Sequence, residues 1–294
     1  MNFKVVKIRD FVGHRQSVYC LCFDPLNRHI YSSGGDGMLV RWKTDEDDGL
    51  LIAKNDSAIF SILYHDDKIF AGSNNGEIIV IDAVNHQIIT KLKLNNHPIY
   101  DIQNDSNKIY IATGDGQIIS LNYDYQIESA LKISNKSIRK LSITPNGFII
   151  AGSEPAVWKF DKNWLLIQKW VNFNSSVFSL LYLDSINMIL SGGRDALIYF
   201  HTDNDINNET IKAHLLHIND MQANHNENLI LTASMDKTIK LWDIRNRVLL
   251  KVIDKEKYDG HTSSVNKIIW INENTFISCS DDRTLKCFEV NPIE

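Results

Sequence analysis

Apolar residues along this chain fall into short runs that alternate with clusters of Gly, Asp, Asn and Ser. In segment 32–42, two such runs flank a turn that contains Gly35, Asp36 and Gly37. Gly and Asp tolerate the backbone angles that tight β-turns require. No 3.6-residue period links the apolar positions, so the pattern predicts short β-strands along the whole chain.

The same turn occurs seven times at a nearly constant spacing. An acidic or amide residue marks each copy: Asp36, Asn75, Asp115, Glu154, Asp195, Asp236 and Asp282. Six residues later a strand carries Trp42, Ile81, Leu121, Phe160, His201, Trp242 and Phe288. Successive members of this second series are 39, 40, 39, 41, 41 and 46 residues apart. A period of this length is typical of repeat architectures.

Each repeat has room for about four strands. An apolar run precedes every turn, and these runs begin at Val18, Ile59, Ile99, Ile138, Val177, Ile218 and Val265. Six copies are followed by a further strand, as in segments 88–94, 127–133 and 248–253. Units of four short strands at roughly 40-residue spacing predict the blades of a β-propeller.

Four dipeptides resemble the Gly-His and Trp-Asp signatures of the WD40 family: Gly13-His14, Ala213-His214, Gly260-His261 and Trp242-Asp243. The resemblance extends over essentially the whole chain. It implies an all-β fold, a seven-bladed WD40 β-propeller in which residues 1–294 form one domain. It also implies a binding platform, but it does not name the ligand, because one fold serves many functions.

The last blade lacks a strand. Seven blades need four strands each, yet only six residues follow Phe288. Segment 3–11 precedes the first repeat and has no other assignment. As is common in WD40 proteins, we expect it to form the outer strand of blade 7, where it shields an edge that would otherwise be open to other chains.

His14, Ser32 and Asp36 have the residue types of a Ser-His-Asp hydrolase, but their spacing recurs. A catalytic triad is needed once, whereas a structural network belongs in several blades. The resemblance implies hydrogen-bonded networks made of His14, Ser32, Asp36 and Trp42, of His214, Thr232, Asp236 and Trp242, and of His261, Ser278 and Asp282. We expect a shorter network in blade 7, because Phe288 lacks an indole N–H, and apolar packing in blades 2 to 5, including packing of His201 at the Trp position.

Candidate binding residues follow from the same register. In a WD40-like propeller the loops between blades lie on the narrower face, and the second residue of each inner strand points to the channel mouth there. These residues are Tyr19, Phe60, Tyr100, Arg139, Phe178, Asn219 and Asn266; the position before each turn adds Arg194 and Met235. Aromatic and Arg side chains dominate interface hot spots. We predict that Tyr19, Phe60, Tyr100 and Phe178 anchor a partner, while Arg139 and Arg194 hold an acidic or carbonyl group. The alternative is that the rings pack only between blades.

Three functions fit this platform. The leading hypothesis is a non-catalytic scaffold that binds a peptide or a partner's loop on the narrow face. A propeller enzyme would need several His, Asp or Glu side chains that converge in the channel, and the seven mouth positions offer none. A modified-peptide reader would use the aromatic residues as a cage for a methylated cation.

Composition and charge narrow the choice of partner. The net charge is −5 and no stretch is dense in Lys and Arg, which argues against nucleic acid or an anionic membrane as the partner. The N-terminus lacks a signal-peptide core, no window of about 18 apolar residues exists, and the four cysteines fit no zinc spacing. We therefore expect a cytoplasmic monomer without cofactor or metal, His214 and His217 included, and a solvated loop or rim element at insertion 254–259.

Overall fold

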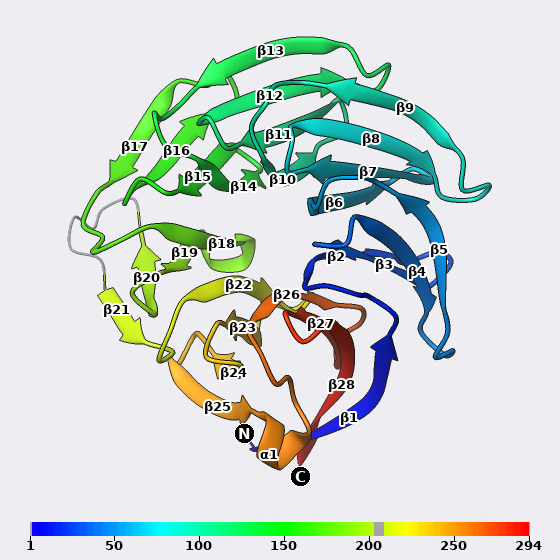
Figure 1. Cartoon of the computed structure of the whole chain (residues 1–294). Helices are drawn as coiled ribbons and strands as arrows, with labels where there is room; N and C mark the ends of the chain where they lie inside the picture. The colour runs from blue at the N-terminus through cyan, green and yellow to red at the C-terminus, as the bar shows by residue number, and fades with distance from the viewer. Residues whose placement is uncertain (1, 203–208, 294) are drawn as a thin grey trace.

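The computed structural model describes residues 2–202 and 209–293, and their strands form seven antiparallel sheets of four strands around one axis (Figure 1). The predicted seven-bladed β-propeller is confirmed. Blades 1 and 2 consist of β2 (Val18–Asp24), β3 (His29–Gly34), β4 (Met38–Lys43), β5 (Gly49–Lys54), β6 (Ile59–His65), β7 (Lys68–Ser73), β8 (Glu77–Asp82) and β9 (Ile88–Lys93).

The next three blades repeat the arrangement. Blades 3 and 4 consist of β10 (Ile99–Asn104), β11 (Lys108–Thr113), β12 (Gln117–Asn122), β13 (Ile127–Lys132), β14 (Ile138–Thr144), β15 (Gly147–Gly152), β16 (Val157–Asp161) and β17 (Leu166–Trp170). Blade 5 consists of β18 (Val177–Leu183), β19 (Met188–Gly193), β20 (Leu197–His201) and β21 (Glu209–Lys212), with a short 3-10 helix at Asp184–Ile186.

The last two blades complete the ring. Blade 6 consists of β22 (Ile218–Ala223), β23 (Ile230–Ser234), β24 (Ile239–Asp243) and β25 (Val248–Ile253). Blade 7 consists of β26 (Val265–Trp270), β27 (Thr275–Ser280), β28 (Thr284–Ile293) and β1 (Asn2–Val12). The first strand of each blade lies next to the channel, and the fourth lies at the outside (Figure 1).

Burial changes from the middle of each blade to its outside. In β7 five of the six residues are buried, so this strand is covered on both faces by its neighbours. In β9 four of the six are exposed, and only every second side chain faces the blade. The core therefore lies between adjacent blades, as where Leu21 and Val40 of blade 1 cluster with Ile277 and Leu285 of blade 7. Each fully buried aliphatic side chain of this kind stabilises the fold by about 1.5–3 kcal/mol.

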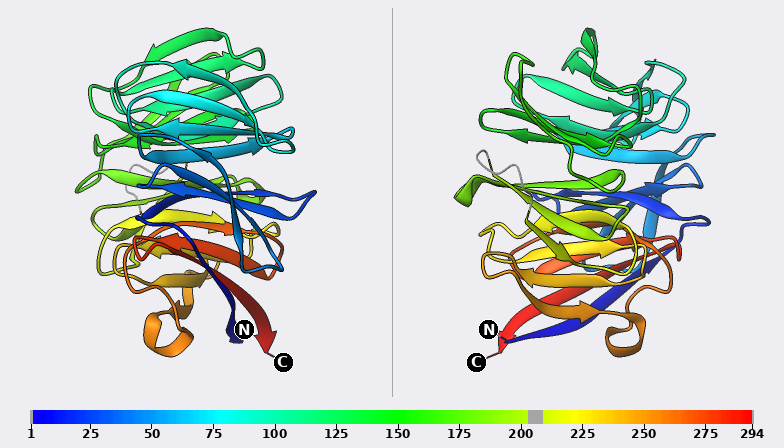
Figure 2. Two further views of the ribbon diagram at one scale, coloured as in Figure 1. Left: turned by 45° about the vertical axis from the view of Figure 1, so that its right-hand side comes forward. Right: turned by 90° about the vertical axis from the view of Figure 1, so that its left-hand side faces the viewer.

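The two ends of the chain close the ring together. Strand β1 pairs antiparallel with β28 from Asn2 opposite Ile293 to Val12 opposite Thr284. Figure 2 shows the two strands running side by side away from the ring. The predicted closure of blade 7 by the N-terminal strand is confirmed, and the side chain of Phe11 is fully buried against Trp42, with ring centroids 5.6 Å apart.

The insertion between blades 6 and 7 is partly helical. Residues Lys255–Tyr258 form α1, a single turn in which the side chain of Asp254 accepts a hydrogen bond from the Lys257 amide at 2.8 Å. The sequence pattern predicts no helix, because one turn is too short to show a period. Strand β1 lies against α1, and Lys7 forms an ion pair with Asp259. The insertion therefore sits at the periphery near both termini (Figure 1). Within the described part of the chain, no helix has the length and apolarity to cross a membrane.

Candidate functional site

Every inner strand bends at its second residue. In β2 the pairing with β3 shifts between Val18 and Cys20, so Tyr19 lies outside the ladder. The same shift occurs at the second residue of β6, β10, β14, β18, β22 and β26. A β-bulge of this kind bends the strand and changes the direction of the side chain at the extra residue. The bulges thus explain why seven equivalent side chains turn toward the mouth of the channel.

These seven side chains line one concavity of about 410 Å³: Tyr19, Phe60, Tyr100, Arg139, Phe178, Asn219 and Asn266. The structure thus brings together the mouth positions that the sequence identifies. Arg194 and Met235, which the sequence adds to the site, are exposed and do not line this concavity. They stand on the turns outside it.

The aromatic residues of the mouth form a continuous arc. The ring centroids of Tyr19 and Phe60 are 5.2 Å apart, and the rings of Phe60 and Tyr100 stack at 5.7 Å. The Arg139 guanidinium lies over Tyr100, with its carbon 3.9 Å from the ring centroid, and 5.8 Å from the centroid of Phe178. The rings therefore pack against neighbours from adjacent blades and at the same time face the concavity.

Among the described residues, Arg139 brings to the mouth a donor atom that has no hydrogen-bond partner. Its Nε is buried and has no hydrogen bond within the described residues. No carboxylate among those residues forms an ion pair with it. A buried donor that stays unpaired costs about 1–3 kcal/mol.

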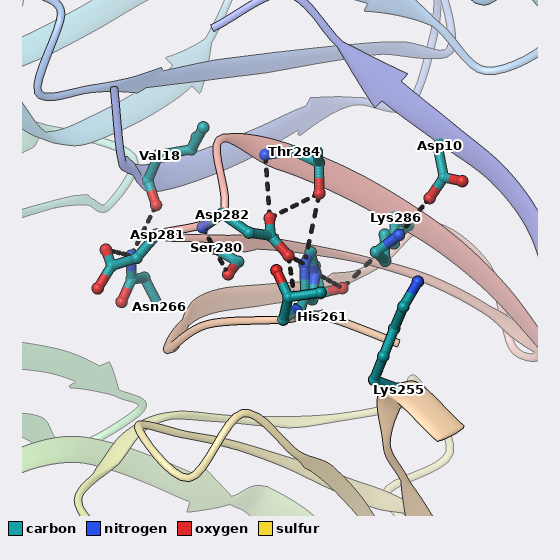
Figure 3. A network of polar contacts seen from close by, with 12 residues as sticks. Asp10, Val18, Lys255, His261, Asn266, Ser280, Asp281, Asp282, Thr284 and Lys286 are labelled. Atoms are coloured by element: carbon teal, nitrogen blue, oxygen red, sulfur yellow. Dashed lines mark hydrogen bonds and ion pairs between the residues drawn. The ribbon is translucent and has the colours of Figure 1, made fainter. Parts of the chain in front are cut away.

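The two asparagines of the mouth differ from its other residues because their side-chain amides bond to neighbouring blades. Asn219 donates through Nδ2 to Ser264 Oγ at 3.0 Å and to the Val265 carbonyl at 2.8 Å. Asn266 donates through Nδ2 to the Val18 carbonyl at 2.9 Å and to Asp281 at 2.8 Å, as Figure 3 shows. These bonds join blade 6 to blade 7 and blade 7 to blade 1, so both amide groups hold the ring together.

A second ring of channel residues lies one position further along the inner strands: Cys20, Ser61, Asp101, Lys140, Ser179, Asp220 and Lys267. Four of them are charged, and these form one network. Lys140 Nζ lies 3.8 Å from Asp101 and 3.5 Å from Asp220, and Lys267 Nζ lies 3.1 Å from Asp220. The network joins blades 3, 4, 6 and 7 across the channel.

Backbone amides hold the two carboxylates of the network in place. The amide of Leu141 donates to Asp101 at 3.0 Å, and that of Ile268 donates to Asp220 at 3.2 Å. Burial lowers the pKa of Lys140, but the carboxylates of Asp101 and Asp220 outweigh burial and hold this pKa above its usual value. The lysine is therefore held as a cation within the network.

Sequence reasoning missed this network. Strict alternation would place Asp220 on the face opposite Asn219, but the bulge turns both residues toward the channel. The signal that could have revealed it is the run of charged residues directly after the mouth positions in blades 3, 4, 6 and 7. Within the described chain, no three His, Cys, Asp or Glu side chains are arranged to hold a metal ion.

The His, Ser and Asp residues with triad-like spacing lie under the turns, away from the channel. In blade 1, Nδ1 of His14 donates to Asp36 at 3.0 Å, because the carboxylate can only accept. The hydroxyl of Ser32 contacts His14 Nε2 at 2.8 Å and accepts from the Trp42 indole at 2.8 Å. The imidazole is buried, so no substrate reaches it.

The same chain of hydrogen bonds recurs in two further blades. His214 contacts Asp236 at 2.9 Å and Thr232 at 2.7 Å, and the Trp242 indole donates to Thr232 at 3.0 Å. In blade 7, His261 contacts Asp282 at 2.8 Å (Figure 3) and Ser278 at 2.9 Å. Every residue assigned to a network in the sequence is therefore found in one.

Blade 5 keeps part of this arrangement with a different residue. His201 occupies the Trp position, and the sequence predicts that it packs in the core. It is buried, and its Nε2 lies 2.7 Å from Ser191 Oγ, in the place of the Trp–Ser hydrogen bond of blade 1. Its ring also lies 5.0 Å from that of Trp170. Packing therefore accounts for only part of what His201 does, because its imidazole also hydrogen-bonds to Ser191 where the indole of blade 1 bonds to Ser32.

Comparison with known proteins agrees with this architecture. The family model "WD domain, G-beta repeat" matches residues 5–43, 207–243 and 254–289. These segments contain the His–Asp networks of blades 1, 6 and 7. Among solved structures, the WD40 β-propeller domain of Doa1 superimposes on this chain with a TM-score of 0.86. The match covers 97% of each chain at 16% sequence identity. That likeness concerns the fold.

Relatives found by sequence match nearly the whole chain at low identity or a short stretch at higher identity. The 66 kDa stress protein of Physarum polycephalum is 22% identical over 96% of this chain and 48% of its own length. The ribosome biogenesis protein YTM1 of Candida albicans is 26% identical over 97% of this chain and 65% of its own length. The human pre-mRNA-processing factor 17 is 38% identical over 21% of this chain and 10% of its own length. The chain thus spans less than two thirds of each of these proteins.

Proposed function

We propose that this chain, which belongs to the WD-repeat β-propellers, is a non-catalytic scaffold that binds a peptide or a loop of a partner protein at the narrow mouth of its channel. The observation that carries this proposal is the concavity of seven bulged residues, with its aromatic arc and its unpaired Arg139. We also propose that the chain works as a monomer in the cytoplasm. Its free thiols at Cys20, Cys22, Cys279 and Cys287 support a reducing compartment.

The aromatic arc is suited to binding because it is already ordered. Tyr19, Phe60 and Tyr100 rest against one another, so a partner does not have to immobilise them. Rings that lose little conformational entropy on binding make strong anchors. Arg139 is held on Tyr100 in the same way and offers planar N–H donors to a carboxylate or a backbone carbonyl of the partner.

A scaffold fits the channel better than an enzyme does. General acid–base catalysis needs a group whose proton can move at the working pH. The carboxylates of Asp101 and Asp220 lie against lysines, and those of Asp36, Asp236 and Asp282 are bound to buried histidines. Two relatives are named for ribosome biogenesis and for pre-mRNA processing, and a scaffold role is compatible with both names.

A methyl-lysine reader is the weaker candidate for the same mouth. A cage binds its cation over the faces of several aromatic rings. Here the Arg139 guanidinium already lies 3.9 Å from the centroid of Tyr100, on the face that a ligand cation would need. A second positive charge would be repelled at that position, so the mouth favours acidic and carbonyl groups.

Affinity capture from the source cells tests the proposal. The wild type is compared with the triple variant Tyr19→Ala, Phe60→Ala, Tyr100→Ala, and captured proteins are quantified by mass spectrometry. A control triple variant, Leu51→Ala, Ile89→Ala, Ile167→Ala, removes the same kind of area from exposed positions on outer strands. We expect partners that the mouth variant loses and the control keeps. Equal recovery of every protein by both variants would exclude this mouth.

A further inference from the structure

The channel opens at its other end into a larger pocket. It has a volume of about 760 Å³ and is formed by the far ends of β2, β6, β22 and β26 and by the loops that follow β2, β22 and β26. Apolar side chains dominate its wall: Phe23, Leu63, Tyr64, Ile269, Trp270 and Ile271, all half-buried. We call this the opposite pocket.

The opposite pocket is separate from the narrow mouth. Along β22, Asn219 lines the mouth, Asp220 belongs to the charged network, and Gln222 lines the opposite pocket. In β26 the order is Asn266, Lys267 and Ile269. The ion pairs of Asp220 with Lys140 and Lys267 therefore lie between the two cavities, and each end of the channel presents its own site.

The residues that line the opposite pocket carry a formal charge of −1 when His225 is neutral, because Glu273 is acidic. Glu273 is the acidic residue among those that line it, and none of the described lining residues is Lys or Arg. Its carboxylate accepts hydrogen bonds from Asn224 Nδ2 at 3.1 Å and Asn226 Nδ2 at 2.9 Å. These neutral donors fix the carboxylate without neutralising it, and no cation of the described chain forms an ion pair with it. A carboxylate accepts up to about four hydrogen bonds, so capacity remains for a ligand.

The wall of the same pocket also carries a fixed aromatic ring. The Trp270 indole donates to the Gln222 carbonyl at 3.3 Å, and its ring meets that of Phe276 edge-on with centroids 5.5 Å apart. On the blade 2 side of the pocket, the Tyr64 hydroxyl donates to Asp67 at 2.9 Å. Aromatic faces attract cations, most strongly when water is partly excluded.

We propose that the opposite pocket binds a basic side chain of a partner protein, arginine in preference to lysine. The long methylene stem of such a side chain packs against Phe23, Leu63 and Ile269, and the cation reaches Glu273. A guanidinium stacks on an indole and donates two parallel hydrogen bonds, which an ammonium group does not. The two ends of the channel thus select opposite charges, with Arg139 at one and Glu273 at the other.

A titration of the full chain with short peptides tests this site. Blocked pentapeptides that differ only in a central Arg, norleucine or Glu are added while the indole N–H signal of Trp270 is followed by NMR. Of the six tryptophans, Trp270 is assigned by the signal that Trp270→Phe removes. We expect saturable shifts with the Arg peptide and roughly fivefold or greater weakening with norleucine, because the charge contributes on the order of 1 kcal/mol. The Glu peptide should bind more weakly still.

Three variants test whether the carboxylate of Glu273 is the charge that binds the Arg peptide. Glu273→Gln keeps the shape of the side chain and should weaken the Arg peptide roughly fivefold or more. Glu128→Gln, the same change on the outer strand β13, should leave its affinity unchanged. The triple variant at the narrow mouth should also bind the Arg peptide normally. Loss of the mouth site can therefore be distinguished from loss of the opposite pocket. Any of three results would overturn the proposal. They are equal affinity for the Arg and Glu peptides, no shift of the Trp270 signal, and full affinity of a folded Glu273→Gln protein for the Arg peptide.

Discussion

Lys140 of blade 4 reaches over the channel to Asp220 of blade 6, with 3.5 Å between Nζ and Oδ1. Blade 5 lies between these two blades, so the contact joins blades that are not neighbours in the ring. The side chain of Asp220 is 1% exposed, and it also accepts from Lys267 and from the amide of Ile268. This one buried carboxylate therefore contacts both lysines of the network.

Removing that carboxylate should destabilise the propeller strongly. In Asp220→Asn, the charges of Lys140 and Lys267 remain buried with only Asp101 to compensate them. Breaking a buried pair on one side costs about 3–5 kcal/mol. Urea denaturation at pH 7 measures the loss. The exposed Asp124→Asn should stay within about 0.5 kcal/mol of the wild type, and an equal, small effect of both changes would contradict the role assigned to Asp220.

The histidine networks predict a difference between blades. In blade 1, Ser32→Ala removes both the partner of His14 and the acceptor of the Trp42 indole, which leaves two buried groups unsatisfied. In blade 7, Ser278→Ala affects His261, while Phe288 has no donor to lose. Each unsatisfied group costs about 1–3 kcal/mol. We therefore expect Ser32→Ala to lower the free energy of unfolding by more than Ser278→Ala; the reverse order would refute this account.

Stability should fall as the pH drops below about 6.5. Burial lowers the pKa of His14, His214 and His261 below the value of 6.5, although Asp36, Asp236 and Asp282 oppose that shift. Between the folded and unfolded pKa values, the unfolded chain binds protons that the folded chain does not. The free energy of unfolding then falls by up to about 1.4 kcal/mol per pH unit for each histidine.

Denaturation at pH 7.5, 6.5 and 5.5 measures this slope. The change His14→Asn removes one titrating group, so the loss of stability between pH 7.5 and 5.5 should be smaller than in the wild type. A variant with the same slope as the wild type, or a stability that rises toward pH 5.5, would show that these histidines do not control the dependence.

Much of this structure can be predicted from the sequence, because the repeat fixes the register. Once the turn at Asp36 is aligned with its six equivalents, Tyr19 and its counterparts are placed at the mouth. The charged network is not predictable in the same way. It depends on a bulge that turns Asn219 and Asp220 toward the same channel, whereas alternation separates them.

Three other features cannot be predicted from the sequence, each for a different reason. The helix α1 is one turn long and leaves no period, and the hydrogen bond of His201 depends on a ring that substitutes for an indole. The opposite pocket combines Tyr64, Gln222 and Trp270 from blades 2, 6 and 7, and no local pattern reports contacts between blades so far apart in the chain.

The turn after the second strand provides a test of backbone strain. Gly37 has φ of +67°, and a Cβ there would overlap the carbonyl oxygen of Asn55. In blade 6 the same turn position holds Lys237 with φ of +73°. Gly37→Ala should therefore destabilise the protein by more than about 1 kcal/mol, whereas Lys237→Gly should be neutral or stabilise it by up to about 1 kcal/mol. Thermal melting of both variants measures the difference, and a loss of equal size in both would contradict it.

Ring closure predicts what happens when the N-terminal strand is lost. Deleting residues 1–12 removes β1, exposes the edge of β28, and uncovers Trp42, which packs against Phe11. An open strand edge recruits other chains, so the truncated protein should aggregate or unfold. A synthetic peptide of residues 1–12 should restore a soluble monomer in light scattering, while the same peptide with Phe3→Asp, Val5→Asp and Phe11→Asp should not, because these three side chains are buried. A truncated chain that stays monomeric at the wild-type melting temperature would show that closure by β1 is dispensable.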